Sequence, residues 1–229
     1  MVEKHQKKLR ILCLHGYRQN EVTFREKTGG LRKAIKSLAE FEFITGPLIP
    51  NIPSDKDSQS TDNDESTVTE LGPRAWWFSK VEETFSSRDV CDVAIGFDKS
   101  VKEVTDYIKE KGPFDGLLGF SQGASMVHLL TSMGYQKKIP LNWKFIIMMS
   151  SFKSLSSVHQ NLVECELKGI PSLQIYGETD QVVHYERSEE LCKLFKEPEP
   201  CIIKHPGGHC VPPMSSAKDS LREFLKQFI

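Results

Sequence analysis

A serine flanked by two glycines is the residue of this chain best suited to nucleophilic chemistry. Ser121 is the centre of Gly119-Phe120-Ser121-Gln122-Gly123, which has the G-x-S-x-G pattern of a nucleophile elbow. Residues 114–118 are typical of a short buried strand, and the apolar residues 124–133 are typical of a helix. A serine on such a sharp turn has strained dihedrals, so side chains at the two elbow glycines, Gly119 and Gly123, would clash. The motif therefore predicts a hydroxyl presented to a substrate above a helix N-terminus, which favours developing negative charge.

An activated serine needs a base, and the base needs an acid that orients it. Asp180 lies in a polar loop after one predicted strand, and His209 follows Pro206-Gly207-Gly208 after the last one. The chain order Ser, Asp, His is the order found on doubly wound hydrolase sheets. We therefore predict a catalytic triad of Ser121, Asp180 and His209. Glu178 is a local alternative to Asp180, and we expect the neighbouring His184 at the surface.

Acyl transfer also needs N–H donors, because its tetrahedral intermediate carries negative charge on oxygen. One donor should be the backbone N–H of Gln122, directly after the nucleophile. The other should come from the loop after the first strand, His15-Gly16-Tyr17-Arg18-Gln19. Gly16 allows close backbone approach, and the backbone N–H of Tyr17 is the candidate donor.

The densest aromatic cluster of the chain is Trp76-Trp77-Phe78, and it has two interpretations. With His15, these residues are candidates for the wall of a substrate pocket. Alternatively, the aromatic cluster anchors a neighbouring polar insertion to the core, and His15 is a packed histidine in a strand-end loop.

These residues imply no cofactor and no metal ion. His205 and His209 have the i, i+4 spacing of a metal-binding pair, but Pro206-Gly207-Gly208 prevents a helix between them. The 6 cysteines are irregularly spaced and include no CxxC pair. This pattern favours reduced, packed thiols over disulfides or a zinc site.

Composition argues against several classes of partner. The net charge of -1 gives no electrostatic reason to expect binding to nucleic acid or to an anionic membrane. Residues 1–8 are polar and do not form a signal peptide, and no apolar run approaches the ~20 residues of a membrane span. We therefore expect a cytoplasmic or nuclear protein that acts on a small molecule without stable membrane insertion; the sequence does not set its oligomeric state.

The elements that must position these residues alternate along the chain. Helical patterns with one apolar face fall between short apolar segments, an order typical of βαβ units. We predict a single α/β domain over residues 1–229, with a doubly wound, mostly parallel sheet and helices on both faces. The polar stretch at about 54–70 is predicted to be a mobile surface insertion. The six predicted strands are residues 10–14, 41–45, 116–119, 144–149, 172–176 and 201–204.

Nearly the whole chain resembles the FSH-type serine hydrolases, a group of α/β-hydrolases. The resemblance rests on Leu14-His15-Gly16-Tyr17-Arg18-Gln19, Phe24-Arg25-Glu26-Lys27-Thr28-Gly29, Trp76-Trp77-Phe78, the segment 112–123 and Gly207-Gly208-His209. It implies the same triad and carboxylesterase activity on an acyl ester substrate of medium to long chain. Two alternatives stay open: an acyl-thioesterase, and a hydrolase-fold protein that binds ligands or partners with little turnover.

Overall fold

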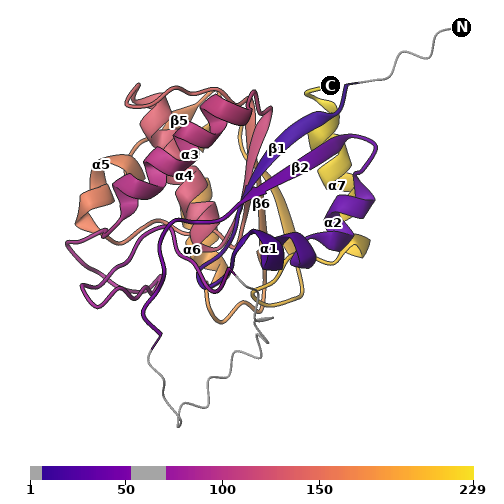
Figure 1. Cartoon of the computed structure of the whole chain (residues 1–229). Helices are drawn as coiled ribbons and strands as arrows, with labels where there is room; N and C mark the ends of the chain where they lie inside the picture. The colour runs from indigo at the N-terminus through magenta and orange to yellow at the C-terminus, as the bar shows by residue number, and fades with distance from the viewer. Residues whose placement is uncertain (1–6, 53–70) are drawn as a thin grey trace, which may run out of the picture.

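The computed structural model describes residues 7–52 and 71–229 and contains one six-stranded sheet in which every neighbouring pair is parallel (Figure 1). The insertion predicted at about 54–70 lies outside the described residues. The strand order is β2-β1-β3-β4-β6-β8, which confirms the doubly wound α/β fold. The strands are β1 (Leu9–Leu14), β2 (Ala39–Ile44), β3 (Gly116–Phe120), β4 (Phe145–Met149), β6 (Ser172–Gly177) and β8 (Cys201–His205).

Helices cover both faces of the sheet. Side chains alternate between the two faces along each strand, and here both sets are apolar, so each face is buried under helices. Leu12 and Leu14 of β1 belong to a core cluster that includes residues of α3 and α4, whereas Ile11 and Cys13 belong to a second cluster with residues of α1, α2 and α7. Figure 1 shows these two groups of helices on opposite sides of the sheet. The helices are α1 (Glu21–Lys27), α2 (Gly29–Ala34), α3 (Phe97–Lys111), α4 (Gln122–Tyr135), α5 (Gln160–Val163), α6 (Tyr185–Cys192) and α7 (Met214–Lys226).

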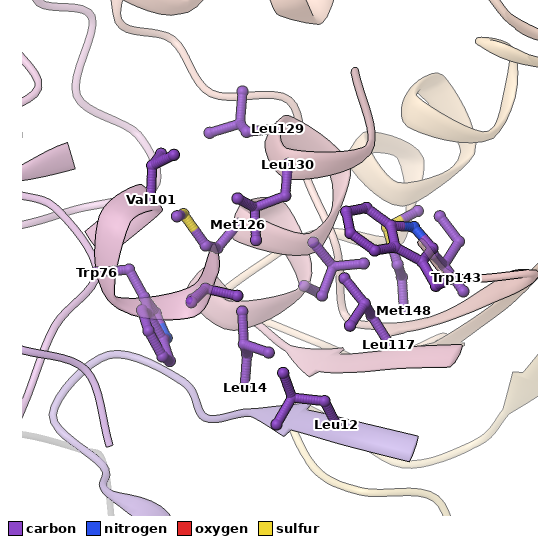
Figure 2. Close-up of a cluster of buried hydrophobic side chains, with 14 of the residues drawn as sticks. Leu12, Leu14, Trp76, Val101, Leu117, Met126, Leu129, Leu130, Trp143 and Met148 are labelled. Atoms are coloured by element: carbon purple, nitrogen blue, oxygen red, sulfur yellow. The ribbon is translucent and has the colours of Figure 1, made fainter. Parts of the chain in front are cut away.

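The first cluster continues up to the carboxyl end of the sheet. Figure 2 shows Trp76 in this cluster, together with Leu14, Val101 and Met126. The segment that carries Trp76 runs along this end and makes isolated bridges to other loops, including Gln19 with Arg74 and Leu48 with Ala75. None of the helices in the described parts of the chain is long and apolar enough to span a bilayer.

All six predicted strands are present, with ends shifted by no more than two residues. The small parallel pair β5 (Leu167–Lys168) and β7 (Phe195–Lys196) has no counterpart among the predicted elements, because two residues are too short to show a pattern. Helix α1 is also unpredicted. Its start carries a capping box, in which the Asn20 side chain accepts from Thr23 N–H and Thr23 Oγ1 accepts from Asn20 N–H.

Candidate active site

The turn between β3 and α4 has the geometry of a nucleophile elbow. Ser121 has φ 53° and ψ -118°, a conformation that L-residues rarely adopt. A Cβ on Gly119 would lie 2.4 Å from Gly123 O, and a Cβ on Gly123 would lie 2.2 Å from Leu14 O. The two glycines are therefore required for the sterically crowded turn, as the motif predicts. Ser121 N–H donates to Met149 O at 2.9 Å, which fixes the turn to the end of β4.

The imidazole of His209 lies between the serine and a carboxylate. Its Nε2 is 3.0 Å from Ser121 Oγ, and its Nδ1 is 2.7 Å from Asp180 Oδ2. Because an ionised carboxylate only accepts hydrogen bonds, Nδ1 carries the proton and Nε2 presents its lone pair to the hydroxyl. The ring also packs on Phe120, with centroids 4.8 Å apart. The structure thus brings the three predicted residues into one hydrogen-bonded chain.

Asp180 is held in its ionised form by its surroundings. The side chain is fully buried, its Oδ1 accepts from Val182 N–H at 2.9 Å and from Val183 N–H at 2.8 Å, and its Oδ2 faces His209. Burial pushes the pKa of Asp180 upward, but the hydrogen bond and electrostatic attraction of His209 and the two backbone N–H groups lower it below its ordinary value. Asp180 is therefore an oriented negative charge behind the imidazole.

The loops that carry Asp180 and His209 are joined to each other. Glu178 N–H donates to His205 O at 2.8 Å, and Thr179 Oγ1 donates to Pro206 O at 3.0 Å. At Gly177 the loops come so close that a Cβ would lie 2.1 Å from Gly207 O. The acid and the base are therefore positioned as a unit at the carboxyl ends of β6 and β8.

Neither of the two predicted oxyanion donors has a hydrogen-bond acceptor within the described chain. Within residues 7–52 and 71–229, no protein group accepts a hydrogen bond from Tyr17 N–H, whereas the N–H groups of Gly16, Arg18 and Gln19 all have acceptors. Gln122 is the first residue of α4, and an N–H group at this position has no partner within its helix. A Cβ on Gly16 would lie 3.0 Å from Phe120 Cδ1, in line with the close approach expected there.

The alternative residues of the two loops lie elsewhere. Glu178 and His184 are exposed, and in the described chain neither side chain forms a hydrogen bond with Ser121 or His209. His205 is buried and accepts from Gly207 N–H at 3.2 Å through Nδ1. In the described segments, no three His, Cys, Asp or Glu side chains gather closely enough to hold a metal ion, and all the cysteines are free thiols.

The four candidate pocket residues do not offer a surface to a ligand. His15 and Trp76 are 0% exposed, Trp77 is 1% exposed and Phe78 is 2% exposed. Trp76 and Trp77 belong to the first core cluster. The Trp76 indole N–H donates to His15 O, both ring nitrogens of His15 bond to backbone groups, and the rings of Trp76 and Trp77 fill the end of the apolar cluster. These side chains therefore belong to the packed interior.

Several residues of the site carry little signal in the sequence. Phe120 packs against the imidazole of His209. Arg187 of α6 donates to Ser87 O at 2.6 Å and to Ser87 Oγ at 3.0 Å, and these two bonds connect α6 to the segment after Trp77. Arg88 donates to Gln181 O at 2.5 Å beside Asp180. For Phe120 the position inside the G-x-S-x-G motif is a usable signal; the arginine contacts depend on loops distant in sequence.

Comparison with known proteins gives the same class of site. A family model described as serine hydrolase (FSH1) matches residues 3–221. Esterase C25G4.2 of Caenorhabditis elegans is 46% identical over 224 residues, covering 97% of this chain and 95% of that protein. Esterase OVCA2 of Homo sapiens is 37% identical over 227 residues, covering 97% and 98%.

Solved structures with low sequence identity share the fold. Zea mays acyl-protein thioesterase 2 superimposes with a TM-score of 0.62 at 20% identity, covering 98% of this chain and 97% of that chain. The Bacillus cereus carboxylesterase superimposes with a TM-score of 0.61 at 18% identity, covering 97% and 89%. Both support the α/β-hydrolase architecture.

Proposed function

Because this chain belongs to the FSH1 family of serine hydrolases, we propose that Ser121 is the nucleophile of a carboxylesterase that works through an acyl-enzyme intermediate. The observation that carries this proposal is the hydrogen-bonded chain from Asp180 through His209 to Ser121, with distances of 2.7 Å and 3.0 Å. The strained φ of Ser121 directs the hydroxyl toward the imidazole and adds independent support.

The chemistry follows from these contacts in two half-reactions. Ser121 Oγ attacks the ester carbonyl carbon while His209 Nε2 takes its proton, and Asp180 stabilises the imidazolium. The tetrahedral intermediate collapses, the C–O bond to the alcohol breaks, and His209 returns the proton to the departing oxygen. Water then attacks the acyl-serine with His209 again as the base, which releases the carboxylic acid and restores Ser121.

The backbone N–H groups of Tyr17 and Gln122 would stabilise the oxyanion in both half-reactions. Two observations support this role. No protein group in the described chain accepts a hydrogen bond from Tyr17 N–H, and Gln122 is the first residue of α4. Removal of one such donor typically costs ~2.7–4 kcal/mol of transition-state stabilisation.

The substrate we propose is an acyl ester of medium to long chain. The family resemblance favours this class, and an exposed apolar side chain lies next to the acid: Val182, whose backbone N–H donates to Asp180 Oδ1, is 39% exposed. Rates on esters of increasing acyl length would test this part: a kcat/KM that does not rise with chain length contradicts it.

Labelling with a fluorophosphonate probe tests the nucleophile directly. Wild type should react, Ser121→Ala should not, and Ser150→Ala is a matched control. Ser150 also has a positive φ, 49°, and follows the neighbouring strand, but no group in the described chain bonds to its Oγ. Equal labelling of wild type and Ser121→Ala would show that Ser121 is not the nucleophile.

The same preparations separate the alternative activities. Matched acyl esters and thioesters compare the two leaving groups, because the ratio of kcat/KM values reports differential transition-state binding. A higher kcat/KM for thioesters would favour the acyl-thioesterase. Turnover near the uncatalysed rate on all substrates, with tight binding of one ligand, would favour a binding protein built on a hydrolase fold.

A further inference from the structure

Three fully buried polar side chains connect the two loops that carry the oxyanion donors. His15, Trp76 and Gln122 are each 0% exposed. The Trp76 side chain bonds to the backbone of His15, and the Gln122 side chain bonds to the backbone of Trp76 and Trp77. We propose that this His15–Trp76–Gln122 network is a positioning device that holds Tyr17 N–H and Gln122 N–H at the oxyanion, a role that rests on the proposed function.

The side chain of His15 fixes the peptide group between Gly16 and Tyr17. Its Nε2 lies 2.8 Å from Gly46 N, and because a backbone N–H only donates, Nε2 is the acceptor. The proton is therefore on Nδ1, which donates to Gly16 O at 2.7 Å. Gln19 N–H donates to the same oxygen at 3.2 Å, so the Gly16 carbonyl is pinned from two sides.

A pinned carbonyl determines where the next N–H points. The Gly16–Tyr17 peptide is trans, and in a planar trans peptide the C=O and N–H bonds point in opposite directions. With Gly16 O directed at His15, Tyr17 N–H is directed to the other side of the loop. A rotated peptide would present the carbonyl oxygen there, and an acceptor would then repel the oxyanion instead of stabilising it.

The protonation state of His15 suits this role. Burial lowers the pKa of His15 to about 4, so the ring is neutral at pH 7 and Nε2 keeps its lone pair for Gly46 N–H. The Nδ1–H that the Gly16 carbonyl needs is then always present.

The side chain of Gln122 fixes the second donor. Its Oε1 accepts from Trp76 N–H at 3.0 Å, and its Nε2 donates to Trp77 O at 2.7 Å. Both ends of the amide thus bond to one dipeptide, which holds the first residue of α4 against the segment 76–77. The Trp76 indole Nε1–H donates to His15 O at 2.8 Å and closes the network. One segment therefore sets the relative position of both oxyanion donors.

Two substitutions at His15 separate the positioning bond from the anchoring bond. The amide of His15→Asn can reach the place of Nδ1 and keep a donor for Gly16 O, whereas the amide of His15→Gln can reach the place of Nε2 and keep only the bond with Gly46. We expect kcat of His15→Gln to fall about 10²-fold with little change in KM, as for loss of one oxyanion donor. His15→Asn should restore most of kcat.

A transition-state analogue provides a second measurement. An acyl trifluoromethyl ketone adds to Ser121 and forms an oxyanion, so its affinity should fall in the same proportion as kcat/KM across the variants. Trp76→Phe keeps a large ring and removes the indole donor; its kcat should fall about 3- to 10-fold with KM unchanged, and this variant tests the network if those at His15 fail to fold.

The outcomes distinguish the positioning role from the proposed function. The positioning role is overturned if kcat is unchanged in His15→Gln and Trp76→Phe. It is also overturned if the losses in kcat only follow the losses in Tm and His15→Asn is no more active than His15→Gln. In either case, Ser121-dependent hydrolysis by wild type would still uphold the proposed function. A wild type without Ser121-dependent hydrolysis would overturn the proposed function, and the positioning role with it.

Discussion

Gly177 ends strand β6 where the loop that carries His209 crosses it. A Cβ at this position would lie 2.1 Å from Gly207 O and 2.5 Å from Gly208 O. Ordinary contact begins at 3.4 Å, so in Gly177→Ala the loop must retreat by more than 1 Å. The substitution removes no functional group, yet it pushes on the backbone one residue before the base.

The expected effect on activity follows from that displacement. The bond from His209 Nε2 to Ser121 Oγ is 3.0 Å long, so a shift of this size breaks it. Misplacement of a reacting group by ~1 Å lowers rates by about 10²-fold, which is the loss in kcat/KM we expect for Gly177→Ala. Overpacking should lower the free energy of unfolding by ~1–3 kcal/mol, so the protein stays folded.

The assay compares ester hydrolysis, fluorophosphonate labelling and thermal unfolding. Gly208→Ala is the matched control, because a Cβ there would meet only Thr179 O at an ordinary 3.7 Å. Its kcat/KM should stay within about threefold of wild type, the usual effect of an uncrowded substitution. If Gly177→Ala hydrolyses esters as fast as Gly208→Ala, the loop yields without moving the imidazole and the reasoning is wrong.

Three further predictions concern the acid, the buried histidines and a loop contact. Asp180→Asn should lower kcat by about 10⁴-fold with a small change in KM, because the amide favours the wrong imidazole tautomer; a loss below tenfold would show that the acid does not orient the base. Three buried histidines have a lower pKa in the folded chain than in the unfolded chain, so below pH 6.5 the unfolded chain binds their protons while the folded chain does not. The free energy of unfolding should therefore fall by up to ~1.4 kcal/mol per pH unit for each of the three. Burial lowers the pKa to about 4 in His15 and His159 and to about 3 in His128, so the loss should extend from pH 6.5 to about 4 for the first two and to about 3 for His128. A urea midpoint that stays constant from pH 7.5 to 5 would refute this. Arg187→Met should lower the free energy of unfolding by ~1–3 kcal/mol, because the two hydrogen bonds to Ser87 are lost while the aliphatic stem can still pack; unchanged urea unfolding would contradict this.

The six strands could be predicted because each is a short apolar run closed by glycine, proline or polar residues. In a parallel sheet the carboxyl ends of these runs meet at one edge, so the order of Ser121, Asp180 and His209 was enough to predict their proximity. The fold prediction is confirmed, and the site geometry has the three residues in one hydrogen-bonded chain.

The remaining features depend on partners that are distant in sequence. An aromatic run such as Trp76-Trp77-Phe78 reads the same whether it lines a pocket or fills a core. Its burial becomes evident only when the bonds to His15 and Gln122 are known. The need for glycine at position 177 likewise arises from a loop 30 residues later, which no local pattern reveals.

The acid–base pair lies at the margin of the sheet, whereas the nucleophile lies at its centre. Strand β8 is at one end of the strand order, and within the described chain its only partner in that sheet is β6. An edge strand opens at lower free energy than a central one, in a local fluctuation that leaves the rest folded. Loss of β8 would carry His209 away while β3, β4 and the strained serine remain in place. In denaturant, inactivation would therefore precede global unfolding, and amides of β8 would exchange with solvent sooner than those of β3.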